Sequence, residues 1–378
     1  MAFFYYLISF LVIINLIVVV HEFGHYLAAK KIGVKVEKFS VGMGPEICGF
    51  NDKEGTRWCL SWLPVGGYVM MLGDGDVSSS TEDLEGFEKL SEEDKKKSII
   101  SKNNWEKMFV AFAGPFSNYV YAFVVVFCMA FFYGVPKYEP IIGEVLKNSA
   151  AEKAGILAGD RILSVDGKKV EKYRDILVHL SISDSDKASF VIDRNGQMIA
   201  LDVIPQVTEK KRIIGAPKRT KMFGLKSTNP TFEKLSFGSA LSRAFSDCVS
   251  ATKEMFMVFG KLFEGKKSLN DFGGVVYMAH VAGDLTKNGN FALLIMFTVT
   301  LSLNLGFINL FPLPVLDGGR ILICFLEEIT RRKFNEKIEE YVMGACAIFL
   351  IFLMFLTTIN DILRIEVVEN FVSKFLGG

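Results

Sequence analysis

The sequence predicts a polytopic α-helical membrane protein with four transmembrane helices, a membrane-associated β-hairpin and one inserted α+β domain on the outer side. Half of the 378 residues are hydrophobic, and 34 are phenylalanine. Four stretches have the roughly 20 apolar residues that a bilayer crossing requires. They cover residues 3–29, 108–133, 291–315 and 341–360. Between the second and third stretches, short alternating segments replace the long apolar runs, which indicates a soluble insertion.

The first predicted helix, residues 1–29, ends in His21-Glu22-Phe-Gly-His25. Residues four apart lie on nearly the same helix face, about 6 Å along the axis, so both imidazoles can bind one metal ion. Glu22 then lies beside a metal-bound water, where a general base is needed. Such a short pattern also occurs by chance in soluble chains. Its position at the end of an uncharged span favours a zinc site, because histidine and glutamate are costly in a membrane.

Basic residues orient the four spans. They follow the first, precede the second and separate the third from the fourth: Lys30, Lys31, Lys35, Lys38, Lys102, Lys107, Arg320, Arg331, Arg332 and Lys333. Under the positive-inside rule, regions 30–107 and 318–340 are cytoplasmic, and both the N-terminus and the tail 361–378 are outside. The histidine motif is therefore expected near the cytoplasmic side of the membrane.

The cytoplasmic region 30–107 is predicted to contain a β-hairpin over residues 38–72. Two β-rich runs flank Asn51-Asp-Lys-Glu-Gly55, which is a turn signal. The second run is unusually apolar, so the hairpin is expected to dip into the membrane. Residues 74–101 are acidic and rich in serine and lysine, and we expect a mobile surface loop there. The second transmembrane helix follows over residues 108–133.

Residues 137–209 predict a small α+β domain. Short strands are expected at 141–145, 161–167, 189–192 and 200–204, with helices near 150–155 and 173–180. Region 210–290 is expected to hold a basic linker and one amphipathic helix. Within the apolar stretch 237–263, the polar residues fall in a stripe roughly 60° wide, which is typical of a helix lying in the interface rather than crossing it: Arg243, Asp247, Ser250, Glu254 and Lys261.

A third metal ligand is expected near the end of the third span, residues 291–317. Catalytic zinc usually has three protein ligands and one open position. The remaining histidines, His179 and His280, fall on the outer side of the predicted topology. Asp317 follows a segment containing Pro312 and Pro314, at the same side and depth as the histidine motif. Broken helix at membrane depth is tolerated where it lines a cavity, so Asp317 is predicted as the third ligand.

Two alternatives to Asp317 as a metal ligand remain open. Asp317 could instead cap the helix that follows it, which is a common role for aspartate. A ligand set of His21, His25 and His280 would require a different topology. The six cysteines show no paired spacing, which argues against a thiolate zinc site or a disulfide scaffold. A net charge of +1 gives no electrostatic basis for nucleic-acid binding.

Three motifs together resemble the site-2 protease family of intramembrane zinc metalloproteases, most closely its bacterial regulator-of-sigma-E protease branch. They are His21-Glu-Phe-Gly-His25, Ala113-Gly-Pro-Phe-Ser-Asn118 and Asn309-Leu-Phe-Pro-Leu-Pro-Val-Leu-Asp317-Gly-Gly319. Residues 149–167 resemble a PDZ core, so the outer domain 137–209 is identified as PDZ-like. Well-known members of this branch carry two tandem PDZ domains, whereas this chain has room for one.

The resemblance implies a site and a function. His21, His25 and Asp317 would bind one zinc ion, and Glu22 would be the catalytic base. Four residues of the third motif region would hold or shape the substrate strand: Asn304, Asn309, Pro312 and Pro314. For the two asparagines, packing between helices is the alternative role. Asn118 is expected to be structural.

The implied enzyme hydrolyses a peptide bond within or near the transmembrane segment of single-span membrane proteins. Membrane-bound anti-sigma factors and signal-peptide remnants are examples, cut in regulated intramembrane proteolysis after trimming by an upstream protease. The implied location is the bacterial cytoplasmic (inner) membrane, in contact with its lipid bilayer, with the PDZ-like domain in the periplasm. The alternative is a non-catalytic PDZ scaffold with a structural zinc site, against which Glu22 argues. A metal transporter is a further alternative, but it would need polar groups through the whole bilayer, whereas here they cluster on one side.

Overall fold

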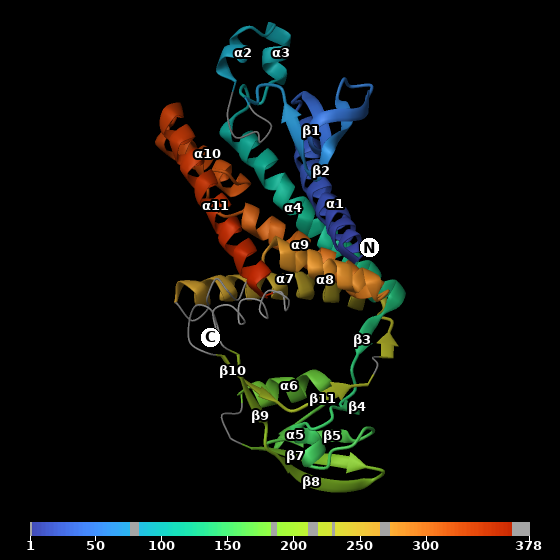
Figure 1. Ribbon diagram of the computed structural model, residues 1–378. Coiled ribbons are helices and arrows are strands. Elements are labelled where there is room, and N and C mark those ends of the chain that lie inside the picture. The colour runs from blue at the N-terminus through green and yellow to red at the C-terminus, as the bar shows by residue number, and fades with distance from the viewer. Residues whose placement is uncertain are drawn as a thin grey trace. The chain divides into compact units, whose positions relative to one another are not determined.

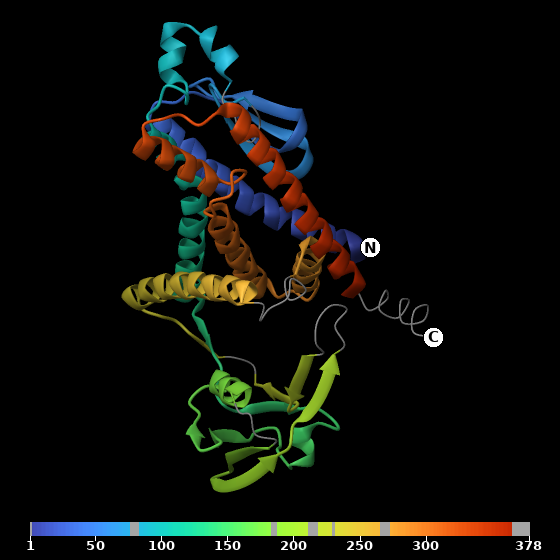
Figure 2. The same ribbon diagram turned by 90° about the vertical axis from the view of Figure 1, so that its left-hand side faces the viewer.

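The computed structural model describes residues 2–75, 83–182, 187–210, 218–228, 231–264 and 273–364. The chain forms two compact units (Figures 1 and 2). The first combines Met1–Phe127 with Arg243–Gly378, and the second is Cys128–Ser242.

Within the described ranges, four helices of the first unit are long and apolar enough to cross a membrane. They are α1 (Ala2–Lys31), α4 (Asn104–Cys128), α9 (Phe291–Asn309) and α11 (Glu336–Arg364). Each contains one of the four apolar stretches. A π-helical turn, Met129–Tyr133, continues α4. The helix α9 ends at Asn309, eight residues before the predicted end of the third span, because the prolines that follow cannot continue it.

The helix α8 (Val275–Lys287) was not predicted from the sequence. It packs against α1 and α9. A buried cluster joins the three helices: Phe10, Ile13, Ile17, Ala282 and Leu301. The described part of region 210–290 therefore contains two helices rather than one. The first turn of α8 depends on a distant residue, because the buried carboxylate of Asp361 on α11 accepts hydrogen bonds from the backbone N–H groups of Gly274 and Tyr277. No local cap marks this start in the sequence.

The predicted hairpin is formed by β1 (Val36–Asn51) and β2 (Arg57–Met71), which pair antiparallel. The Asp52 carboxylate accepts hydrogen bonds from the N–H groups of Glu54 and Thr56, and so closes the expected turn. The half near α1 is buried in a shared cluster with that helix. The far half exposes large apolar side chains, as a membrane-dipping hairpin requires: Met43, Ile47, Phe50, Leu60, Trp62 and Leu63.

The loop expected over residues 74–101 instead contains two short helices, α2 (Leu84–Glu88) and α3 (Glu92–Lys97). Each has a side-chain cap: Asp83 accepts a hydrogen bond from the Gly86 N–H, and Ser91 accepts one from the Asp94 N–H. Such caps offset the low helix propensity of a polar segment. Residues 76–82, within the predicted loop, lie outside the described residues.

The amphipathic helix is found with the predicted bounds, as α7 (Phe237–Phe263). Its small residues Ala244 and Cys248 are buried against Ala122 of α4 and Val299 of α9. A non-helical segment, 310–316, joins α9 to α10 (Asp317–Thr330). Within the predicted tail 361–378, residues 361–364 belong to α11 and the rest lie outside the described residues.

The second unit contains a four-stranded antiparallel sheet in the order β6-β5-β7-β8. Its strands are β5 (Arg161–Val165), β6 (Lys168–Lys169), β7 (Ala188–Arg194) and β8 (Gln197–Val203). The helices α5 (Ala150–Lys153) and α6 (Tyr173–Ile182) contribute to the same core. Residues from β5, β7, α5 and α6 are fully buried there, including Ala151, Ile162, Ile176, Phe190 and Ile192.

A buried ion pair fixes the edge of this core. The Asp160 carboxylate is 1 % exposed and accepts two hydrogen bonds from the Arg194 guanidinium, at 2.7 and 2.8 Å. Burial alone would raise the pKa of Asp160, but the hydrogen bonds from Arg194 and from the Leu157 N–H outweigh it and lower that pKa below its usual value. Asp160 therefore stays ionised, which keeps the pair intact.

The second unit does not end at residue 209. The strands β3 (Val135–Lys137) and β4 (Ile142–Val145) pair with β12 (Thr231–Glu233) and β11 (Leu225–Ser227). In addition, β9 (Gln206–Lys210) pairs with β10 (Lys218–Met222). Part of the expected basic linker thus returns to the domain as strands. These strands have three to five residues, too few to show a clear alternating pattern.

Candidate metal centre

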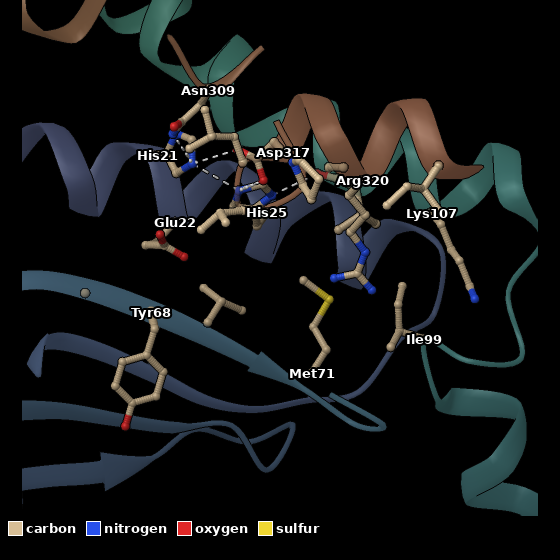
Figure 3. A pocket seen from close by; sticks show the side chains of 18 of the residues that line it. His21, Glu22, His25, Tyr68, Met71, Ile99, Lys107, Asn309, Asp317 and Arg320 are labelled. Atoms are coloured by element: carbon tan, nitrogen blue, oxygen red, sulfur yellow. Dashed lines mark hydrogen bonds and ion pairs between the residues drawn. The ribbon is translucent and has the colours of Figure 1, made fainter. Parts of the chain in front are cut away.

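Three side chains from the two ends of the chain meet at one point (Figure 3). The Nε2 atoms of His21 and His25 are 3.2 Å apart. The Asp317 carboxylate lies 3.1 Å from His21 Nε2 through Oδ2, and 3.3 Å from His25 Nε2 through Oδ1. Among the described residues, this trio is the group of histidines, cysteines and carboxylates that is placed to hold a metal ion.

The spacing of the trio fits a tetrahedral zinc ion. Zinc bonds to histidine and carboxylate are about 2.0–2.1 Å long, which separates neighbouring ligand atoms by roughly 3.3–3.4 Å. The three separations of 3.1–3.3 Å are close to that value. Both histidines are buried. Two Nε2 lone pairs and a carboxylate at this distance repel one another unless a cation lies between them.

The second nitrogen of each imidazole contacts α4, which sets the tautomer. His25 Nδ1 is 2.9 Å from the carbonyl oxygen of Val110, so it carries the proton and leaves Nε2 free to bind a metal. His21 Nδ1 is 3.1 Å from Nδ2 of Asn118, whose Oδ1 is buried without a hydrogen-bond partner among the described residues. When His21 Nε2 binds a metal, Nδ1 carries the proton, and two N–H donors then face each other. Turning the Asn118 amide by half a turn removes this mismatch, because Oδ1 then accepts the Nδ1–H of His21.

Small residues bring α1 and α4 together at the site. A Cβ atom at Gly24 would lie 2.3 Å from the carbonyl oxygen of Ala113, and one at Gly114 would lie 2.2 Å from His25 Nε2. The Ser117 hydroxyl donates a hydrogen bond of 2.7 Å to the carbonyl of Val20. The second motif, Ala113 to Asn118, therefore forms the surface on which the two imidazoles rest.

Replacing Gly114 with alanine is expected to weaken zinc binding about 10–100-fold, the range typical for lost orientation of a ligand. The new methyl group would collide with His25 Nε2 and force the ring away from Val110. Zinc affinity is measured by competition with a chelator. Gly344→Ala in α11 is the matched control, because nothing lies within 4 Å of its added Cβ. Wild-type zinc affinity in Gly114→Ala would contradict this account.

Asp317 reaches the imidazoles because the chain folds back tightly before it. A Cβ at Gly318 would lie 2.3 Å from the carbonyl oxygen of Leu310, and one at Gly319 would lie 2.1 Å from that of Leu313. Only glycine fits these close approaches. The N-cap of α10 is Leu316, without a side-chain cap bond, so the carboxylate faces the histidines instead of capping the helix.

His280, the alternative ligand, lies on α8 away from this trio. Its Nε2 is 3.3 Å from Asp284, and its ring stacks on Tyr6 at 5.1 Å between centroids. His179 is half-buried in the second unit, with its Nε2 3.3 Å from the Lys169 carbonyl. Neither histidine belongs to the candidate metal group found among the described residues.

Glu22 lines the cavity beside the two histidines. The cavity has a volume of about 600 Å³, and its lining includes His21, His25, Tyr68 and Asp317. Figure 3 shows Glu22 on the side of α1 that faces β2. The backbone N–H of Val69 on β2 donates a hydrogen bond to the Glu22 carboxylate. The hairpin therefore orients this carboxylate, a contact that no sequence pattern indicates.

The predicted substrate residues divide into two pairs. Asn309 Nδ2 lies 3.3 Å from His21 Nε2, and both Asn309 and Pro314 line the cavity. Asn304 lies five residues earlier on α9, on another face of the helix, and neither it nor Pro312 is among the cavity-lining residues of the described chain. Asn118, expected to be structural, directly contacts a predicted ligand.

The helices and the site define the class of the protein: a multi-pass membrane protein with the paired histidines, carboxylate and adjacent glutamate typical of zinc metallopeptidases. The sequence model of peptidase family M50 matches residues 9–353. The chain therefore belongs to peptidase family M50, the site-2 proteases. It is a zinc metalloprotease.

Curated relatives match along their whole length. A protein of Mesorhizobium japonicum is 33% identical over 360 residues, which cover 94% of this chain and 98% of the relative. A protein of Agrobacterium fabrum is 32% identical over 363 residues, covering 94% and 95%. Both are named as zinc metalloproteases. Metalloprotease MmpA of Caulobacter vibrioides is 28% identical over 394 residues, covering 98% of each chain.

Proposed function

We propose that His21, His25 and Asp317 bind the single zinc ion and that Glu22 is the catalytic base. The observation that carries this proposal is the triangle of ligand atoms with sides of 3.1–3.3 Å. Both imidazoles are oriented through Nδ1, and the open side of the triangle faces a cavity that also contains Glu22. A structural zinc site in a scaffold protein would need neither the open side nor the adjacent base.

The chemistry is hydrolysis of a peptide bond. A zinc ion at this site would act as a Lewis acid that makes water nucleophilic at neutral pH. Glu22 accepts the proton of the attacking water and then delivers it to the leaving amine. The Val69 N–H holds the Glu22 carboxylate in place for both transfers. The cavity is lined on one side by α1 and on another by β2, so the peptide enters between the helix and the hairpin.

The substrate we propose is the transmembrane segment of a single-span membrane protein. The two histidines lie on a helix that is apolar enough to span a bilayer, and Asp317 follows another such helix after a short non-helical segment. A substrate helix satisfies its own backbone hydrogen bonds and must unwind before a carbonyl can react. The Asn309 amide, at the cavity, can hydrogen-bond the exposed strand. The unpaired edge of the hairpin can add it as a further strand.

The cellular setting belongs to the same proposal. The enzyme resides in the bacterial cytoplasmic (inner) membrane, with its active site near the cytoplasmic side. The second unit is a PDZ-like domain on the periplasmic side, and it screens substrates trimmed by an upstream protease. Basic residues around the connecting regions support this orientation. Membrane-bound anti-sigma factors and signal-peptide remnants are the substrate classes that fit, in regulated intramembrane proteolysis.

The direct test uses purified full-length protein in proteoliposomes with a tagged single-span protein. Mass spectrometry of the products locates the cut. We expect cleavage inside or within a few residues of the apolar segment, abolished by a zinc chelator and restored by added zinc. Cleavage confined to soluble regions of the substrate would overturn the intramembrane part of the proposal. Cleavage that persists without metal would overturn the zinc mechanism itself.

A further inference from the structure

Asn15 is a polar residue in the apolar part of α1, six residues before the first histidine. Its Nδ2 donates hydrogen bonds to the carbonyl of Leu11, at 2.7 Å, and to the carbonyl of Pro64 on β2, at 2.6 Å. Both partners are acceptors, so the amide nitrogen must face them. The Oδ1 atom is buried without a partner among the described residues. Such a group is costly, and an apolar residue would avoid the cost.

The carbonyl that Asn15 holds lies in a break of the hairpin ladder. Residues 38–41 of β1 pair with two runs of β2, residues 57–60 and residues 67–70, and Pro64 lies in the segment that joins these runs. Such a connecting segment leaves backbone groups outside the ladder. In an apolar setting an unpaired carbonyl is unfavourable, and the Asn15 amide supplies the missing donor.

Beyond Pro64, β2 runs along the same face of α1 towards Glu22. Residues 15 and 22 are seven apart, nearly two helical turns, and therefore share a face. A Cβ at Gly67 would lie 3.7 Å from Val18 and 3.9 Å from Glu22 Cγ. Two residues later, the Val69 N–H meets the Glu22 carboxylate. Asn15 and Glu22 thus both make polar contacts from α1 to this strand.

We propose that Asn15 is a positioning residue for Glu22. By holding the Pro64 carbonyl, Asn15 fixes the register of β2 along α1, and this register places the Val69 N–H on the Glu22 carboxylate. The proposal rests on Glu22 being the catalytic base. It predicts that loss of the Asn15 amide lowers turnover while zinc binding and folding stay intact. The reason is that residues of α4 orient the two imidazoles and that Asp317 lies on α10, so none of the three ligands depends on Asn15.

The test compares full-length wild type with Asn15→Leu and Asn15→Ser in proteoliposomes. Leucine removes both hydrogen bonds, whereas a serine hydroxyl can still bond the Leu11 carbonyl but is too short for Pro64. We expect kcat to fall about fivefold to tenfold in both variants, with KM and zinc affinity near wild type. Hydrogen exchange of the β2 peptide that contains Val69 should become faster. Thermal stability should be unchanged or higher in Asn15→Leu, because a costly polar group is removed.

Tyr6→Phe is the matched control. It removes the hydrogen bond from the Tyr6 hydroxyl to Asp284, which joins α1 to α8 rather than to β2, and wild-type kcat is expected. Wild-type kcat in Asn15→Leu, or a loss in Asn15→Leu that Asn15→Ser does not share, would overturn the inference. So would slow exchange at Val69 in both variants. Glu22→Gln, assayed in parallel, separates the role of Glu22 as the base from the role of Asn15 in positioning it. Full activity in Glu22→Gln would show that Glu22 is not the base, whichever result the Asn15 variants give.

Discussion

Replacing Glu22 with glutamine is expected to lower kcat by about 10²–10⁴-fold, the usual contribution of a general acid–base group. Glutamine has nearly the same shape and can accept the Val69 hydrogen bond through its oxygen, but it cannot take the proton of the attacking water. The three predicted ligands are untouched. Turnover of a tagged single-span substrate, together with zinc content by atomic absorption, measures both effects.

The control for this change is Glu46→Gln on β1. Glu46 pairs with Arg57 across the hairpin. Its replacement therefore tests whether the loss of any carboxylate in this region lowers turnover. We expect turnover in Glu46→Gln to stay near wild type. Equal turnover in Glu22→Gln and wild type would refute the role of Glu22. Loss of zinc in Glu22→Gln would instead mean that the carboxylate supports the metal site.

Replacing Asp317 with asparagine is expected to weaken zinc binding by more than about 100-fold, since even partners outside the ligand set contribute 10–100-fold. The substitution keeps the shape but removes the negative charge that faces His21 and His25 at 3.1 and 3.3 Å. Proteolysis should fall in proportion to zinc occupancy and recover in part at high zinc concentration. Titration against a chelator of known affinity gives the dissociation constant.

Asp361→Asn provides a second buried carboxylate for comparison. Asp361 is 3 % exposed and caps α8 through Gly274 and Tyr277, with no part in the metal group. Its replacement should lower the thermal stability of the membrane-spanning unit and leave zinc affinity unchanged. If Asp317→Asn binds zinc as tightly as wild type, the third ligand has been assigned wrongly.

Long-range regularities of the sequence predicted the larger elements. The apolar runs located α1, α4, α9 and α11, and the amphipathic pattern over residues 237–263 located α7. The turn at Asp52 was predictable from local residue types. In contrast, α8 begins at a cap supplied by Asp361, and β11 and β12 pair with strands about 80 to 100 residues away. Such partners cannot be found from local patterns.

The residues of the site also divide into those that sequence patterns predict and those that depend on distant partners. His21 and His25 were predicted from helix periodicity, and Asp317 was predicted from the topology that the basic residues indicate. The contacts of Val110 and Asn118 with the imidazoles depend on how α1 crosses α4. The Val69 N–H on Glu22 depends on how the two runs of β2 pair with β1, which only the folded hairpin reveals. These contacts arise from packing between elements, which a single sequence does not specify.

The separation of the proposed ligands along the chain has a consequence for biosynthesis. His21 and His25 lie on α1, whereas Asp317 begins α10 and is translated later, after α9. A nascent chain therefore holds two imidazoles but no complete ligand set until α10 is made. Under the proposed mechanism, newly made molecules remain inert towards neighbouring membrane proteins, and towards one another, until that point.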